Sequence, residues 1–89
     1  MSRIELAPEL REDFDRILDH LARHEADNPH ARIREIIQAI DVLEHNPFIG
    51  RPVDTYTREL VIGRRSRGYL ALYRYVAEID TVFVLALRS

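Results

Sequence analysis

The chain has no cysteine, and all 13 of its basic residues are arginine rather than lysine. Without cysteine, disulfides, thiolate metal sites and cysteine nucleophiles are excluded together, which fits a cytoplasmic location best. Long apolar runs are missing too, since none approaches the roughly 20 residues that a membrane helix needs. The first residues, Met1 to Arg3, lead into no signal-peptide core. We therefore expect neither membrane insertion nor secretion.

Length and composition indicate a single small domain, residues 1–89. With 89 residues, 46% hydrophobic and 31% charged, the chain can build one core but not two. A chain of this size buries only roughly 60% of the surface that its unfolded form exposes, so its stability is marginal. A tightly bound partner would stabilise it considerably.

The net charge of −2 hides a marked asymmetry between the two halves of the sequence. Residues 1–47 contain 6 Arg against 11 acids, whereas residues 48–89 contain 7 Arg against 4 acids. Arg64, Arg65 and Arg67 lie close together, and Arg74 follows soon after them. This cluster creates a local positive field on a chain of otherwise acidic character.

The first half of the sequence predicts a short strand and two helices. Residues 3–7 alternate weakly, as a strand does. A helix is predicted from about Pro8 to Glu25, where apolar residues repeat at helical spacing: Leu10, Phe14, Ile17, Leu18 and Leu21. A second helix starts at the Asn28-Pro29 signal and ends near His45, because Pro47 disfavours helical geometry in the residue before it. The short connection between them predicts an antiparallel hairpin.

Beyond Gly50 the apolar period changes from 3.6 to 2, which predicts three antiparallel strands. The alternating residues are Leu60 and Ile62, then Leu70, Leu72 and Val76, then Phe83, Leu85 and Leu87. Gly68 lies in the first predicted turn, and residues 77–80 form the second. The order of elements indicates an α+β domain, in which a short N-terminal strand and an antiparallel helical hairpin pack on a mainly antiparallel sheet of three to four strands.

The leading candidate for a functional patch is the predicted turn from Arg64 to Tyr69. Its guanidinium groups suit bidentate phosphate contacts, and the ring of Tyr69 could stack on a base or on an arginine. The alternative is a charged, solvated hairpin loop without a ligand. The candidate target-binding residues are therefore Arg64, Arg65, Arg67 and Tyr69.

The next predicted strand has two faces of different character. Three tyrosines share one face with small residues, namely Tyr69, Tyr73 and Tyr75 with Ala71 and Ala77, and the other face carries Leu70, Leu72, Arg74 and Val76. The pattern leaves open which face meets the helices. If the leucine face is the core, Arg74 must lie at the sheet rim, pair with an acid such as Glu59 or point into a cleft. If the tyrosine face is the core, Arg74 lies outside.

Other polar clusters are better explained without a ligand. His20 and His24 have a spacing that can chelate a metal, but no carboxylate motif completes a site. The acids of the same helix, Glu12, Asp13, Asp15 and Asp19, are interpreted as partners of the helix dipole and of nearby arginines. No glycine-rich phosphate loop and no supported Ser-His-Asp arrangement is present. We expect no metal and no cofactor.

Taken in order, several segments resemble the RelE/ParE toxin superfamily of type II toxin-antitoxin systems. Besides the helical hairpin, they are NPFIGRPV (46–53), RELVIG (58–63), GYLALYRYV (68–76) and VFVLAL (82–87). The resemblance covers nearly the whole chain. It implies a compact toxin of the plasmid-stabilisation type, which a cognate antitoxin neutralises by wrapping around it in a hetero-oligomer. One branch of the superfamily cuts messenger RNA on the ribosome, and another inhibits DNA gyrase.

Individual residues separate the two branches. The resemblance implies that the ribonuclease branch has a basic residue directly after the Gly-Tyr pair, and a basic residue with a tyrosine or histidine near the C-terminus. Here Leu70 follows Gly68-Tyr69, and only Arg88 matches the terminal basic position. A ribonuclease would have to use what remains: Arg65, Arg67, Tyr73, Arg74 and Arg88.

We therefore expect a ParE-like toxin whose partners are a cognate antitoxin and DNA gyrase, and which is not an enzyme. Two alternatives stay open. One is a RelE-like endoribonuclease that acts on messenger RNA at the ribosome, and the other is an inactive relative that only binds its antitoxin.

Overall fold

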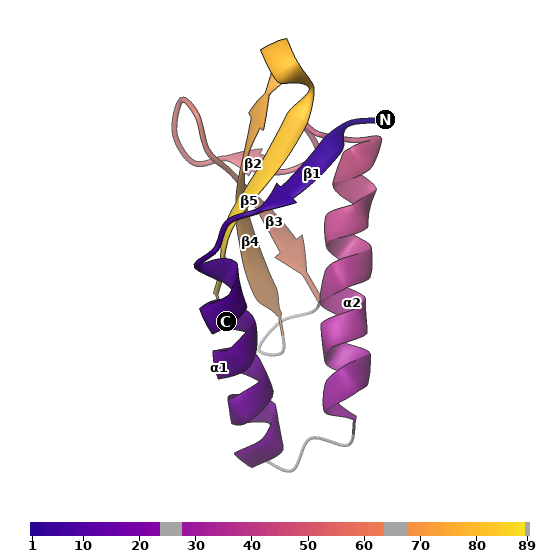
Figure 1. The fold of residues 1–89 in the computed structure, drawn as a ribbon, viewed down its shortest axis with the longest axis vertical. Helices are drawn as coiled ribbons and strands as arrows, with labels where there is room; N and C mark the ends of the chain where they lie inside the picture. Colours follow the sequence, from indigo (N-terminus) through magenta and orange to yellow (C-terminus); the bar gives the residue numbers. More distant parts are fainter. Residues whose placement is uncertain (24–27, 64–67, 89) are drawn as a thin grey trace.

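The computed structural model describes residues 1–23, 28–63 and 68–88. In chain order the elements are β1 (Arg3–Leu6), α1 (Leu10–Arg23), α2 (Pro29–Asp41), the 3-10 turn η1 (Val42–Glu44), β2 (Arg51–Pro52), β3 (Arg58–Ile62), β4 (Tyr69–Val76), the 3-10 turn η3 (Ala77–Ile79) and β5 (Thr81–Arg88). Two antiparallel helices flank one sheet in Figure 1. The predicted α+β fold with its N-terminal strand is confirmed.

Both helices follow their sequence signals, although α1 begins at Leu10 rather than at Pro8 and α2 ends at Asp41 rather than near His45. α1 begins at Leu10 because the preceding residues form a turn, in which the amide of Leu10 donates to the carbonyl of Ala7 at 3.0 Å. The side chain of Asn28 accepts a hydrogen bond from the amide of Ala31 at 3.0 Å, and so caps α2. Within the described ranges, no helix has both the length and the apolar character needed to cross a membrane.

The sheet has five strands in the order β1-β5-β4-β3-β2. β3, β4 and β5 are antiparallel as predicted, whereas β1 pairs with β5 in parallel, with Arg3 opposite Thr81. The short strand β2, which pairs with β3, was not predicted. Two residues that include a proline carry no alternation for a sequence pattern to reveal, so the sheet has one more edge strand than the three to four expected.

The tyrosine face of β4 is the one that meets the helices. Ala71 and Tyr73 have 0% exposure, and Tyr69 and Tyr75 pack against the same core, while Arg74 is exposed on the opposite face. The other core residues come from both helices, from η1 and from the neighbouring strands: Leu10, Ile17, Ile36, Ile40, Leu43, Ile62, Val82, Val84 and Leu87. This placement removes the difficulty that Arg74 posed, because nothing forces its charge into an apolar layer.

The alternation predicted for β5 is wrong over part of its length. Phe83, Leu85 and Leu87 were expected to share a face, but Val82, Val84 and Leu87 are the buried residues and Leu85 is 38% exposed. The cause is a β-bulge: Leu72 of β4 lies opposite Ala86 while Tyr73 lies opposite Val84, which leaves Leu85 as an extra residue. An extra residue reverses which side chains face the core.

A buried hydroxyl fixes the loop that leads into β2. The amide of Gly50 donates to the Tyr73 hydroxyl at 2.7 Å, and the Arg58 guanidinium donates to the carbonyls of Gly50 at 2.7 Å and Phe48 at 3.2 Å. A Cβ on Gly50 would lie 2.6 Å from that hydroxyl and 2.8 Å from the carbonyl oxygen of Glu59, so only glycine fits. Burial raises the pKa of Tyr73, which the Gly50 hydrogen bond and the nearby Arg58 charge partly oppose.

A small polar cluster holds the start of β1 against the turn before β5. Asp80 has the left-handed φ of 46°, and its carboxylate accepts hydrogen bonds from the hydroxyls of Tyr75 at 2.6 Å and Ser2 at 2.7 Å. The Tyr75 and Ser2 bonds lower the pKa of Asp80 below its ordinary 3.8, and the same Asp80 bond raises the pKa of Tyr75. The amide of Arg3 adds a bond to the carbonyl of Asp80 at 2.9 Å.

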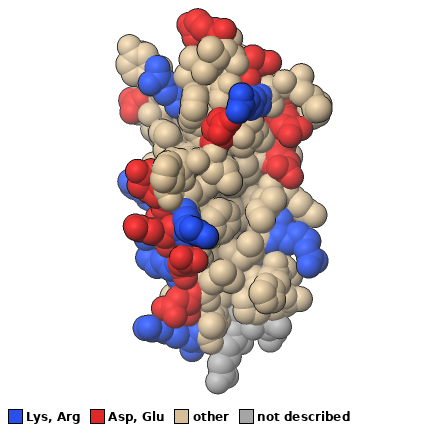
Figure 2. Space-filling model, viewed as in Figure 1, with Lys and Arg blue, Asp and Glu red and all other residues tan. Residues whose placement is uncertain are grey.

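Side chains of α1 cap the part of β5 that extends beyond β1. Asp13 accepts a hydrogen bond from the amide of Leu87 at 2.9 Å, and Arg16 donates to the Leu87 carbonyl at 3.4 Å. Arg16 also pairs with Asp13 at 3.0 Å, and Arg23 pairs with Asp19 at 3.2 Å, which confirms ion-pair roles for these two acids. Acidic and basic side chains alternate along the left border of the surface in Figure 2, over α1.

Candidate functional site

The sheet face that points away from the helices, here called the outer sheet face, is the first candidate surface. The strand register assigns ten residues of β3, β4 and β5 to it: Glu59, Val61, Leu70, Leu72, Arg74, Val76, Thr81, Phe83, Ala86 and Arg88. Its middle is apolar, and Val61 is 65% exposed. Glu59 forms an ion pair with Arg51 of β2 and not with Arg74. The face therefore combines an apolar centre with two arginines for which the described residues provide no ion-pair partner.

Of the candidate target-binding residues, the structure describes Tyr69. Arg64, Arg65 and Arg67 lie outside the described residues, so their role stays a prediction. Tyr69 is the first residue of β4, lies opposite Ile62 and packs against the core. Its ring belongs to the helix-covered face, which is one of the two arrangements that the sequence pattern left open.

Of the residues that a ribonuclease would need, the three that the structure describes do not gather at one place. Tyr73 is fully buried beneath the helices, with its hydroxyl bound to Gly50, while Arg74 and Arg88 belong to the outer sheet face. Arg88 lies opposite Leu70, four residues along β4 from Arg74, a separation of about 14 Å at the usual rise per residue. Arg65 and Arg67 lie outside the described ranges.

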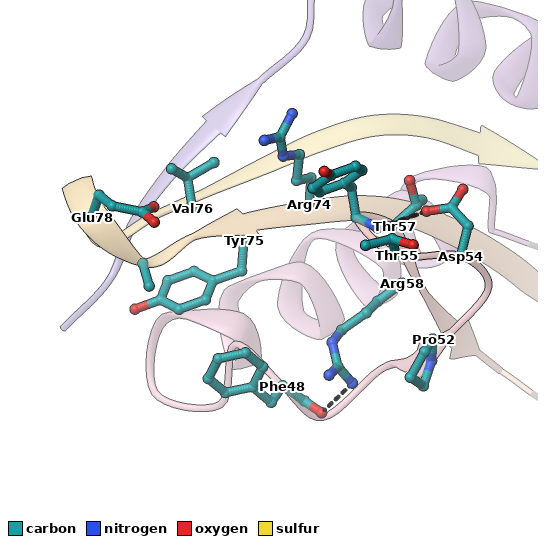
Figure 3. A pocket seen from close by; sticks show the side chains of 12 residues that line it. Phe48, Pro52, Asp54, Thr55, Thr57, Arg58, Arg74, Tyr75, Val76 and Glu78 are labelled. Carbon is teal, nitrogen blue, oxygen red and sulfur yellow. Dashed lines mark hydrogen bonds between the residues drawn. The ribbon is translucent and has the colours of Figure 1, made fainter.

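A second candidate surface lies at one edge of β4. A pocket of about 290 Å³, here called the edge pocket, is lined by residues that include Phe48, Pro52, Tyr56, Arg58, Arg74 and Tyr75. Figure 3 shows Phe48, Arg58 and Tyr75 on one side of β4, and Arg74 and Val76 on the other. The pocket therefore follows the strand edge and reaches both of its sides.

Aromatic rings and arginines contact one another in the edge pocket. The guanidinium carbon of Arg74 lies 5.0 Å from the centre of the Tyr56 ring, and that of Arg58 lies 5.1 Å from the centre of the Phe48 ring. Both distances fit cation–π contacts. Phe48 also meets Tyr75 edge to face, with ring centres 5.1 Å apart. Phe48 and Tyr56 are nevertheless 61% and 67% exposed, so their rings are open to a partner.

Sequence reasoning missed the edge pocket. Its residues come from two segments, 48–58 and 74–78, that are separated by 15 residues of sequence. The available signal was two aromatic residues, Phe48 and Tyr56, in a stretch otherwise rich in proline, threonine and glycine. Pocket formation also requires Asp54, whose carboxylate shapes the turn by accepting the amides of Tyr56 and Thr57, each at 2.8 Å. These two bonds lower the pKa of Asp54.

No group of three or more metal-ligating side chains occurs among residues 1–23, 28–63 and 68–88. Of the histidine pair that sequence spacing raised, His20 is exposed on α1 and His24 lies outside the described part of the chain.

Comparisons with known proteins agree with this architecture. The chromosomal ParDE toxin-antitoxin system of P. aeruginosa contains a chain of similar fold, with a TM-score of 0.79 and 18% identity, over 99% of this chain and 95% of that chain. The E. coli RelBE complex gives 0.70 and 13%, over 100% and 96%. The RelE–RelB complex of Pyrococcus horikoshii OT3 gives 0.62 and 14%, over 98% and 92%. At these identities the likeness shows the fold alone. No curated protein sequence matches the chain.

A family model adds what the solved structures cannot decide. The model of the ParE toxin of the type II toxin-antitoxin system parDE matches residues 4–89, from β1 through the end of β5. The match covers both helices and all of the strands except the first residue of β1. The chain therefore belongs to the ParE toxin family of type II toxin-antitoxin systems.

Proposed function

We propose that this toxin arrests growth by inhibiting DNA gyrase, and that a cognate antitoxin neutralises it by binding. The observation that carries the proposal is the ParE family match over residues 4–89. The antitoxin partner has further support, because the similar solved structures from P. aeruginosa, E. coli and P. horikoshii are toxin-antitoxin systems.

The geometry of the outer sheet face supports inhibition by contact over RNA cleavage. A ribonuclease must bring a proton acceptor and transition-state cations to about 3 Å from a single scissile phosphate and its ribose. Arg74 and Arg88 are about 14 Å apart along the strand, and the pair Leu72 and Ala86 lies between them. Tyr73 and Tyr75, the phenols on either side of Arg74 in sequence, both belong to the opposite, helix-covered face of the sheet.

The same face has the character of a protein-binding surface. Its centre is apolar and partly exposed, and its arginines lie at the two ends of the apolar strip. Apolar surface with arginines around it is a common composition of protein interfaces. The cluster Arg64, Arg65 and Arg67, next to β4 in sequence, would add positive charge that attracts gyrase or its DNA complex.

The first experiment compares the two mechanisms directly. Purified toxin is added to gyrase with relaxed plasmid, and separately to an extract that translates a defined messenger RNA. We expect loss of supercoiling with accumulation of cleaved gyrase–DNA complexes, and an intact message. Codon-dependent cuts in the message with normal supercoiling would replace the proposal with the ribonuclease alternative. No effect in either assay, together with antitoxin binding, would identify an inactive relative.

A second experiment tests the arginine cluster. Replacing Arg64, Arg65 and Arg67 by Ala together should abolish growth inhibition, because the charges that meet the target are lost, while antitoxin affinity and stability stay near normal. The matched control replaces Arg11 and Arg34, which are exposed on the two helices, and should remain toxic. Full toxicity of the triple variant would exclude the cluster from the contact with gyrase.

A further inference from the structure

One stretch of β4 has a strand partner on only one side. Pairing with β3 ends at Arg58 opposite Tyr73, whereas pairing with β5 continues to Val76 opposite Thr81. Residues 74–76 therefore have β5 on one side and the β2–β3 turn on the other. No backbone hydrogen bond joins these three residues to that turn, which is described in full.

The open stretch offers main-chain hydrogen-bonding groups to a partner. Successive residues of a strand direct their N–H and C=O groups to alternate sides. The backbone N–H and C=O groups that face the edge pocket therefore belong either to Tyr75 or to both Arg74 and Val76. The groups of the remaining residues face β5. Unpaired groups of this kind are a template onto which an extended segment can add as another strand.

The end of β5 shows how this fold covers a strand edge that has no neighbouring strand. There the amide and the carbonyl of Leu87 are both occupied by side chains of α1, Asp13 and Arg16. At the other edge of the sheet, β2 contains Pro52, which lacks an amide to donate. The stretch 74–76 has neither form of protection.

The edge pocket also indicates the chemistry of its occupant. Neither Arg58 nor Arg74 forms an ion pair with any described acid, and Arg58 uses one terminal nitrogen to reach two backbone carbonyls. The remaining guanidinium N–H groups are suited to a carboxylate, which can accept two parallel hydrogen bonds. The volume of about 290 Å³ lies at the lower end of the range for ligand sites, which suits a few residues of peptide.

On the basis of the proposed function, we propose that the edge pocket binds an extended acidic segment of the antitoxin, which pairs with residues 74–76 as an added strand and places a carboxylate on Arg74. The rings of Phe48 and Tyr56 then cover apolar side chains of that segment. A nucleic acid fits this site less well, because it cannot continue the strand pairing with residues 74–76.

Amide hydrogen exchange on the free toxin and on its complex with the cognate antitoxin tests the pairing. We expect exchange at the edge-facing amides of residues 74–76 to slow at least tenfold in the complex. Affinity is measured for Arg74→Glu and for the milder Arg74→Gln, with Arg34→Glu on α2 as a matched charge reversal. Both Arg74 variants should weaken binding, Arg74→Glu by at least tenfold, and Arg34→Glu should bind like the wild type.

The outcomes separate this proposal from the function on which it rests. Tight antitoxin binding with unchanged exchange at 74–76, or with full affinity in Arg74→Glu, overturns the edge site and leaves the toxin assignment standing. Failure of the wild-type chain to bind the antitoxin overturns both. A single-stranded oligonucleotide that protects the same amides when the antitoxin does not would replace the peptide with a nucleic acid.

Discussion

The hydrogen bond between the Gly50 amide and the Tyr73 hydroxyl gives the sharpest test of how this fold is held. Tyr73→Phe keeps the buried ring and removes only the oxygen that accepts this bond at 2.7 Å. Gly50 is itself buried, so water cannot replace the lost acceptor. A buried donor left without a partner costs about 1–3 kcal/mol of the free energy of unfolding.

The expected shift is large enough to measure in a small domain. Taking about 2 kcal/mol and a urea m-value of about 1.5 kcal/mol/M, the unfolding midpoint should fall by about 1.3 M. Thermal unfolding should show a fall of about 8–16 °C, at about 4–8 °C for each kcal/mol. The control is Tyr56→Phe, since that phenol is 67% exposed and the described residues supply no hydrogen-bond partner for it.

Comparison of the two variants decides the matter. Tyr56→Phe should unfold within about 0.5 kcal/mol of the wild type, as surface substitutions usually do. If Tyr73→Phe is equally stable, or if the two variants lose the same amount, the reasoning about the buried donor is refuted. A change in m-value would instead mean that the unfolded state had changed, and exchange of the Gly50 amide would then replace the midpoint as the measurement.

Three more predictions follow from the contacts described above. Gly50→Ala should lower the free energy of unfolding by about 1–3 kcal/mol, because its Cβ overlaps Tyr73, and the loss should be less than additive with Tyr73→Phe in a double-mutant cycle. Asp13→Ala should cost about 1 kcal/mol and speed exchange of the Leu87 amide, while Asp13→Asn, which keeps an acceptor oxygen, should change both less. Asp80→Asn should make the melting temperature less sensitive to acid. Because the pKa of Asp80 is lowered in the folded state, its carboxylate stabilises the fold at pH values above the ordinary pKa of 3.8. This stabilisation is lost as the pH falls through the folded-state pKa. Asn is the chosen replacement because it tolerates the left-handed backbone at this position.

Each of these expectations can be contradicted by its own measurement. Additive losses in the Gly50 and Tyr73 cycle would show that the two sites do not share a contact. Slow exchange of the Leu87 amide in Asp13→Ala would mean that α1 does not protect the edge of β5. Melting temperatures of Asp80→Asn are followed from about pH 5 to about pH 2. If their dependence on acid is the same as in the wild type, other carboxylates cause that dependence.

Much of the fold could be predicted because its signals are local. The cap at Asn28 and the apolar stripe from Leu10 to Leu21 depend on neighbours within one helix, and both describe the structure well. The face of β4 could not be chosen from its own sequence, because both sets of side chains contain apolar residues. The bulge at Leu85 could not be predicted for the same reason. Every residue from Val82 to Leu87 is apolar, so no alternation of apolar and polar residues marks the extra residue.

The candidate site was predictable to a smaller extent. The arginine cluster at 64–67 was evident as a charge run, and its role in target binding stays a prediction. The edge pocket depends on where the pairing of β3 stops, at Arg58, and no sequence pattern contains that information. Arg74 stood out in the sequence as a charge on an apolar strand, but its contact with Tyr56 arises only when the β2–β3 turn folds back over the sheet.

Because β1 pairs in parallel with β5, the first strand cannot find its partner until the last strand has been synthesised. Ser2 and Asp80, which are hydrogen-bonded to each other, are 78 positions apart in the chain. A ribosome that adds about 5–20 residues per second needs about 4–16 s to cover that interval. Throughout it, the apolar side chain of Ile4 has no strand beside it, and the sheet lacks β5, the strand that joins β1 to β4. The sheet is therefore complete only after β5 has been synthesised, and an antitoxin that recognises the complete sheet cannot bind earlier.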